Sequence, residues 1–158
     1  MNKLEFYQEL NRSLTALIAG EPDAIANLAN ASALVYERLA KINWAGFYLM
    51  KGGELVLGPF QGKPACIRIA LGTGVCGTAA AQKQTILVPD VHQFPGHIVC
   101  DPASQSEIVV PIISGGRVRG VLDIDSPIIN RFDQLDQSGL EQFVKILESE
   151  IAWPDITD

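Results

Sequence analysis

The sequence has little positive charge, no long apolar run and few cysteines. The net charge is −6 over 158 residues, and no cluster of Lys and Arg is present, which argues against a nucleic-acid or anionic-membrane partner because phosphate groups attract clustered positive charge. The apolar runs are far shorter than the roughly 18 residues of a membrane-spanning helix. Glu5 and Glu9 stand where a signal peptide would be apolar, so we expect none. These absences predict a cytoplasmic protein.

The three cysteines are Cys66, Cys76 and Cys100, and no C-x-x-C pair is among them. The two histidines, His92 and His97, lack the spacing of a zinc finger. We therefore expect no metal site, and we expect both histidines to serve as hydrogen-bonding loop residues. In a reducing compartment, cysteines are more often core, metal-binding or redox-active residues than partners in a structural disulfide.

The surroundings of the cysteines differ. Cys76 follows Val75 at an apolar helix start, which predicts a buried core residue, and Cys66 stands at a strand edge. Cys100 lies in the polar loop of "HIVCDPASQSEIVVP" (97–111), where a core residue is unexpected. The two loop or edge cysteines could meet in the fold, so redox chemistry is one interpretation and chance is another.

The order of helical and strand patterns predicts an α+β fold. Length and composition, with 47% hydrophobic residues, predict a single domain over residues 1–158. Periodicity and turn residues predict helices at 3–19, 23–40 and 133–151, and a Gly-rich turn that leads into a short helix at 72–82. They predict strands at 43–50, 54–60, 66–70, 85–90, 107–113 and 117–125, and a long loop at 89–106. We expect one antiparallel sheet of about six strands, with the N- and C-terminal helices packed on one face.

Side-chain alternation predicts one functional face. Residues two apart share a face of a strand, so Trp44, Gly46 and Tyr48 lie together, as do Asp123 and Asp125. Aspartate is poor strand material, which favours a functional reason over a solvated surface. Both aromatics could also be ordinary core residues.

Glu107 begins the neighbouring strand and could be a surface acid or a third carboxylate of the same pocket. If the two hairpins join, two aromatics and three acids line one pocket, with Gly46 leaving room for a ligand. The helices would then cover the opposite face, which carries Phe47, Leu122 and Ile124. The segment "GTGVCG" has no following lysine, so it is a helix entry and not a phosphate loop.

The chain resembles the free methionine-R-sulfoxide reductases, single-domain members of the GAF fold. The resemblance covers essentially the whole chain and is carried by "INWAGFYL", "LVLGPFQGKPACIRI", "GVCGTAAA", "DVHQFPGHIVCDPASQSEIVVP" and "GVLDIDS". It implies that Cys100 is the nucleophile, Cys66 the main resolving cysteine, and Cys76 a secondary resolver or a bystander. It also implies a substrate site lined by Glu107, Asp123 and Asp125, with Trp44 and Tyr48 as its apolar wall.

The implied reaction reduces free methionine sulfoxide through a Cys100 sulfenic acid, which condenses with Cys66 to a disulfide. An external dithiol such as thioredoxin would reduce that disulfide. Repulsion among three buried carboxyls should keep one protonated, and we favour Asp125 as the proton donor. The 89–106 loop is the expected lid, a homodimer is expected from the fold, and neither a metal nor a tightly bound cofactor is required.

Two alternatives remain at this point. A GAF sensor would bind a small molecule without chemistry, although we expect no output domain because the fold itself occupies the 158 residues. A thiol redox switch would form the disulfide as a signal. Turnover of free methionine sulfoxide separates the enzyme from both alternatives.

Overall fold

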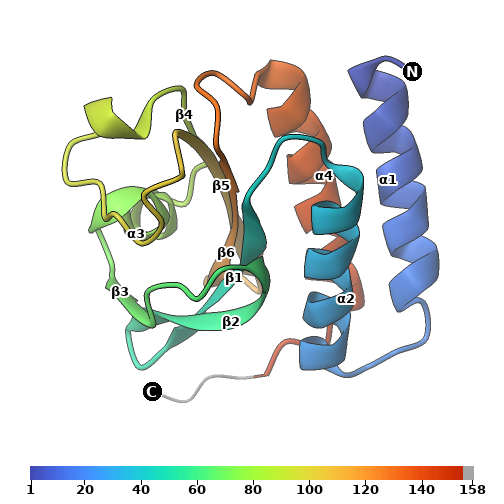
Figure 1. Cartoon of the computed structure of the whole chain (residues 1–158). Helices are drawn as coiled ribbons and strands as arrows, with labels where there is room; N and C mark the ends of the chain where they lie inside the picture. Colours follow the sequence, from blue (N-terminus) through green and yellow to red (C-terminus); the bar gives the residue numbers. More distant parts are fainter. Residues whose placement is uncertain (155–158) are drawn as a thin grey trace.

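The computed structural model in Figure 1 describes residues 1–154 and shows an antiparallel sheet between helices. The elements in chain order are α1 (Lys3–Ile18), α2 (Ala24–Arg38), β1 (Trp44–Lys51), β2 (Glu54–Gly62), β3 (Arg68–Ala70), α3 (Gly74–Gln82), β4 (Ile86–Val88), the 3₁₀ helix η1 (Val91–Gln93), β5 (Ser106–Ser114), β6 (Arg117–Ser126) and α4 (Gln134–Glu150). The six strands lie in the order β3-β2-β1-β6-β5-β4. This arrangement confirms the predicted α+β class and both hairpins.

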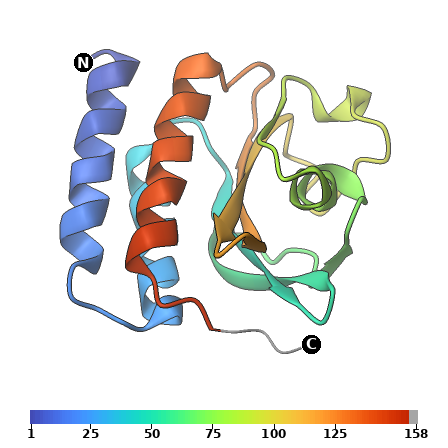
Figure 2. The ribbon, with the colours of Figure 1, turned by 180° about the vertical axis from the view of Figure 1, so that it is seen from behind.

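The helices form two unequal layers. Helices α1, α2 and α4 lie on one side of the sheet, and α3 lies alone on the other side (Figures 1 and 2). The prediction that helices cover mainly one face is therefore confirmed, with α3 as the exception. The predicted 89–106 loop contains η1. Within residues 1–154, no helix combines the length and apolarity that crossing a bilayer requires.

Side-chain caps fix the starts of the long helices. Asn2 accepts a hydrogen bond from the Glu5 amide, and Asp23 accepts one from the Ala26 amide. Asp133 begins α4 with a reciprocal capping box involving Asp136. Such caps satisfy backbone donors that lack a partner in the first turn.

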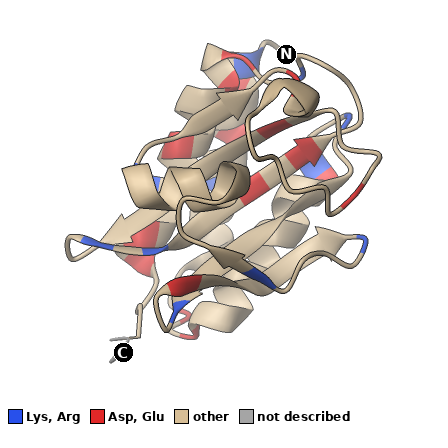
Figure 3. Ribbon diagram, turned by 90° about the vertical axis from the view of Figure 1, so that its left-hand side faces the viewer, with Lys and Arg blue, Asp and Glu red and all other residues tan. Residues whose placement is uncertain are grey.

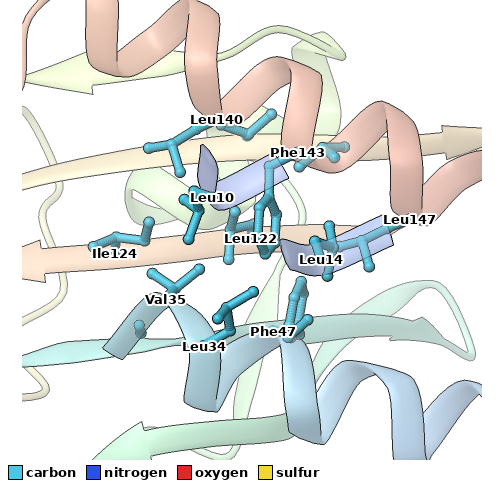
Figure 4. Packing of buried hydrophobic residues seen from close by; sticks show 14 of the residues in the cluster. Leu10, Leu14, Leu34, Val35, Phe47, Leu122, Ile124, Leu140, Phe143 and Leu147 are labelled. Atoms are coloured by element: carbon cyan, nitrogen blue, oxygen red, sulfur yellow. The ribbon is translucent and has the colours of Figure 1, made fainter. Parts of the chain in front are cut away.

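The main core lies between the sheet and the three-helix layer. Phe47, Leu122 and Ile124 point from the central strands toward the helices, as their alternation predicted, and all three are fully buried. Figure 4 shows them packed with Leu14 of α1 and Phe143 of α4. A second, smaller cluster occupies the α3 side of the sheet. The large core thus packs against the helix-covered face of the sheet, and the opposite face, on the α3 side, is left to form a functional site.

Candidate active site

The register of three adjacent strands gathers the predicted site residues. Trp44 of β1 lies opposite Asp125 of β6, which lies opposite Glu107 of β5. Asp123 and Tyr48 stand two and four residues along their strands from Asp125 and Trp44, so they face the same side. The acidic positions on the central strands lie behind α3 in Figure 3. The predicted union of both hairpins at one face is confirmed.

These side chains form the floor of a pocket, and three other segments of the chain cover it. It contains about 560 Å³ of space, part of it open to solvent. The cover comes from residues 64–65, from the first turn of α3, and from five residues of the loop before β5, namely His97, Ile98, Cys100, Asp101 and Ser104. The lining residues are Trp44, Tyr48, Pro64, Ala65, Ile69, Thr73, Gly74, Val75, Cys76, His97, Ile98, Cys100, Asp101, Ser104, Glu107, Asp123 and Asp125.

The three floor carboxyls share a poorly hydrated space. Burial, and then repulsion from Asp123, raises the pKa values of Glu107 and Asp125 well above their ordinary values. Burial also raises the pKa of Asp123, but hydrogen bonds from Glu107, Cys76 and Asp125 oppose that rise. Asp123 is therefore the favoured carboxylate, while Glu107 and Asp125 favour the protonated form.

Asp123 also has an unused acceptor. Its Oδ1 is buried and has no hydrogen-bond partner among residues 1–154. A buried, unpaired carboxylate oxygen is costly unless a ligand satisfies it. The pocket floor is consequently suited to a ligand that brings a positive charge or a strong hydrogen-bond donor.

A disulfide joins Cys66 to Cys100 at the pocket. Their Cα atoms are 5.7 Å apart, and 34 positions separate them in the sequence. Both cysteines are partly exposed, and Cys100 lines the pocket. The structure therefore brings together the loop cysteine and the strand-edge cysteine, which spacing alone left open.

Cys76 is the remaining free thiol, and it is buried as predicted. Burial, followed by the nearby charge of Asp123, raises the pKa of this thiol well above its usual value, so it stays protonated and weakly nucleophilic. Cys76, Glu107 and Asp123 place donor atoms within 4.8 Å of one another. Among the described residues, this mixed set of one sulfur and two oxygens is the group that could hold a metal ion.

The two aromatic residues hold the segment that carries Cys66. The Tyr48 hydroxyl donates to the Cys66 carbonyl at 2.8 Å, and the Trp44 indole N–H donates to the Lys63 carbonyl at 3.1 Å. Trp44 stacks between Tyr48 and Phe60. Burial raises the pKa of Tyr48, so its hydroxyl remains a hydrogen-bond donor. These aromatics are thus anchors as well as pocket walls.

Asn43 holds the segment that carries Cys100. Its Nδ2 donates to Asp101 Oδ2 at 3.0 Å and to Ser104 Oγ at 3.1 Å. Its backbone N–H donates to the Asp125 carbonyl at 2.9 Å. The start of β1 therefore ties the Cys100 loop to the strand that carries the acids.

One expectation about the site was wrong. Gly46 does not leave room for a ligand, because a Cβ there would lie 2.2 Å from the Cβ of Phe60. The glycine instead allows strand β2 to pack closely against β1. His97 lies in the loop, as expected, and it also lines the pocket, with Nε2 3.9 Å from Glu107 Oε1. Burial lowers the pKa of His97, which favours a neutral imidazole.

Sequence reasoning missed the roles of His97, Asp101 and Asn43. The first two lie within three residues of Cys100, so proximity to that cysteine was the available signal. Asn43 directly precedes the aromatic strand, and an asparagine at that position does not indicate a functional role from sequence alone.

The comparisons agree with this architecture. The GAF domain family matches residues 23–151. The free methionine-R-sulfoxide reductase of Escherichia coli (strain K12) is 57% identical over 155 residues, covering 98% of this chain and 94% of that protein. The protein of the same name from Saccharomyces cerevisiae is 49% identical over 155 residues, covering 93% of this chain and 86% of its own length.

A solved structure gives the same result. The free methionine-R-sulfoxide reductase of Neisseria meningitidis, in complex with its substrate, is 45% identical, superposes with a TM-score of 0.92, and is matched over 95% of this chain and 90% of that one. The chain therefore belongs to the GAF-domain family and, within it, to the free methionine-R-sulfoxide reductases.

Proposed function

We propose that this chain reduces free methionine-R-sulfoxide to methionine, with Cys100 as the nucleophile and Cys66 as the resolving cysteine. The observation that carries the proposal is the Cys66–Cys100 disulfide beside a pocket floored by three acidic residues, of which Glu107 and Asp123 are buried. The disulfide is the oxidised form that the two cysteines would take after they have reduced one molecule of substrate. The E. coli and N. meningitidis relatives, which carry the reductase name, support the same chemistry.

Substrate binding uses the charge pattern of the floor. The ammonium group of the amino acid lies against Asp123, whose free Oδ1 accepts a hydrogen bond, with Glu107 as its neighbour. Trp44 and Tyr48 border the apolar part of the substrate. His97, Ile98, Asp101 and Ser104, which line the pocket from the loop before β5, close over the ligand as a lid. This lid favours a free amino acid over a residue within a peptide chain.

The first chemical step transfers oxygen from the substrate to Cys100. The Cys100 thiolate attacks the sulfoxide sulfur, while Asp125, favoured in its protonated form, donates a proton to the sulfoxide oxygen. The sulfur–oxygen bond of the substrate breaks, methionine leaves, and Cys100 becomes a sulfenic acid. Substrate sulfur is reduced by two electrons, and Cys100 is oxidised by two.

The second step resolves the sulfenic acid. The Cys66 thiol attacks Cys100 Sγ, the disulfide forms, and the oxygen departs as water. A thioredoxin-type dithiol then reduces the disulfide by exchange. Cys76 is buried, and the raised pKa of its thiol keeps it protonated, so it serves at most as a secondary resolver. Homodimer formation stays a prediction, which analytical ultracentrifugation tests.

The decisive experiment combines purified protein, dithiothreitol and free methionine-R-sulfoxide, with methionine measured by chromatography. Wild-type protein should produce methionine continuously. Cys100→Ser should produce none, because a neutral hydroxyl is a far weaker nucleophile than a thiolate. Binding without methionine formation would identify a sensor instead. Oxidation by peroxide, combined with indifference to the sulfoxide, would identify a redox switch.

A further inference from the structure

The two bonded cysteines each have an exposed apolar neighbour. Ile67 follows Cys66 and is 67% exposed, and Val99 precedes Cys100 and is 66% exposed. Apart from Met1, these are the two most exposed large hydrophobic side chains among residues 1–154. Isolated exposed apolar residues are common, but here the two extreme cases flank the same disulfide.

The disulfide also places these side chains close to each other. The cysteine Cα atoms are 5.7 Å apart, and each neighbour adds one Cα–Cα step, so the Cα atoms of Ile67 and Val99 lie within about 13 Å of each other. The segment before β3 and the loop before β5 lie on the α3 side of the sheet in Figure 1. Neither residue lines the pocket, so substrate binding does not explain their exposure.

We propose that Ile67 and Val99 form the docking surface for a protein dithiol that reduces the Cys66–Cys100 disulfide. This inference rests on the proposed function, which requires an external reductant in every turnover. The partner thiolate attacks one sulfur of the disulfide, forms a mixed disulfide, and releases the other cysteine as a thiolate. The second thiol of the partner then attacks the mixed disulfide. The partner dissociates in its oxidised form, and Cys66 and Cys100 are both reduced.

The surroundings favour a protein over a small anionic thiol. Asp101 adjoins Cys100, and the pocket floor beneath carries Asp123, so a negatively charged thiol meets negative charge when it approaches. The exposed side chains of Ile67 and Val99 make no favourable contact with a small charged molecule of this kind. A protein that presents its thiol within an apolar surface would bury Ile67 and Val99 while reaching the partly exposed cysteines.

The test separates docking from chemistry by changing the reductant. Ile67→Ser, Val99→Ser and the double variant are assayed at saturating methionine sulfoxide, first with dithiothreitol and then with thioredoxin regenerated by thioredoxin reductase and NADPH. Ile25→Ser is the matched control, because Ile25 is 55% exposed and belongs to α2 in the three-helix layer. The variants change exposed side chains, so folding should persist, and circular dichroism verifies it.

Each single variant should raise the KM for thioredoxin about tenfold, the worth of one apolar contact of this size, and the double variant should raise it further. Turnover with dithiothreitol should remain at the wild-type value, and Ile25→Ser should match wild type with both reductants. An unchanged KM for thioredoxin in the double variant would overturn the docking surface, as would an equal loss with both reductants. Failure of the wild type to turn over with dithiothreitol would instead refute the proposed function.

Discussion

Replacing Asp125 by Asn should make the protein more stable and less active. Asn preserves the shape of the side chain but cannot ionise. In the folded protein, burial and the charge of Asp123 raise the pKa of Asp125 well above its ordinary value. The unfolded chain has no such environment, so there the carboxyl ionises with a pKa of about 3.9.

The sign of the effect follows from proton linkage. Below the unfolded pKa, Asp125 is protonated in both states and carries no penalty. As the pH rises above about 4, the unfolded state releases a proton that the folded state retains. The free energy of unfolding then falls by about 1.4 kcal/mol per pH unit until the folded-state pKa is reached. Asp125→Asn lacks this loss, so its advantage over wild type should be small near pH 4 and grow toward neutral pH.

The size of the effect is measurable by thermal unfolding. For a chain of this length, each kcal/mol corresponds to a shift of about 2–4 °C in Tm. We expect Asp125→Asn to unfold several degrees above wild type at pH 7, with both proteins reduced by the same thiol. A stability difference that does not depend on pH, or a variant less stable at pH 7, would refute the assigned protonation of the pocket.

The activity should move in the opposite direction. Loss of a positioned proton donor typically lowers kcat by about 10²–10⁴, whereas KM should change less because Asp123 and Glu107 hold the ammonium group. If Asp125→Asn raises KM alone, the proton donor is another residue. Stability and catalysis would thus be opposed at one carboxyl, as at many active sites.

Three further predictions concern the neighbouring groups. Cys66→Ser should still form one equivalent of methionine in a single turnover, but its thioredoxin-driven turnover should fall sharply; a normal rate would mean that another thiol resolves the sulfenic acid. Glu107→Gln and Asp123→Asn should mainly raise KM for the sulfoxide in steady-state assays, and a collapse of kcat in either would reassign the proton donor. Asn43→Asp places a carboxylate against that of Asp101 and removes a charge-assisted hydrogen bond worth about 1.5–3 kcal/mol, so single-turnover methionine formation should slow roughly tenfold or more. The double variant Asn43→Asp with Asp101→Asn exchanges donor and acceptor and should recover most of the rate, whereas no recovery would show that this contact does not position the nucleophile.

Strand periodicity accounts for the part of the site that could be predicted. Because side chains alternate strictly along a strand, Asp123 and Asp125 had to share a face, as did Trp44 and Tyr48. Apolar residues at the intervening positions then indicated which face the helices cover. The fold class followed from the order of the same patterns.

The remaining features depend on contacts between segments that have no periodicity. Strand alternation placed Gly46 on the pocket face, but only the packing of β2 shows that Phe60 occupies the space beside it. His97 and Asp101 belong to a loop whose path is set by tertiary contacts. The proximity of Cys76 to the floor acids depends on how α3 crosses the sheet, which no local pattern indicates.

The Cys66–Cys100 disulfide closes a loop that contains β3, α3, β4 and η1, each of which contributes residues to the smaller cluster on the α3 side of the sheet. In the chain-entropy description, closing a loop of this length stabilises by about 4 kcal/mol, and this constraint disappears whenever the bond is reduced. Every catalytic cycle would therefore alternate residues 66–100 between a tethered and an untethered state, while α1, α2 and α4 keep the same constraints throughout. Amide hydrogen exchange in α3 should then report the redox state of the protein, with the amides of the three-helix layer as an internal reference.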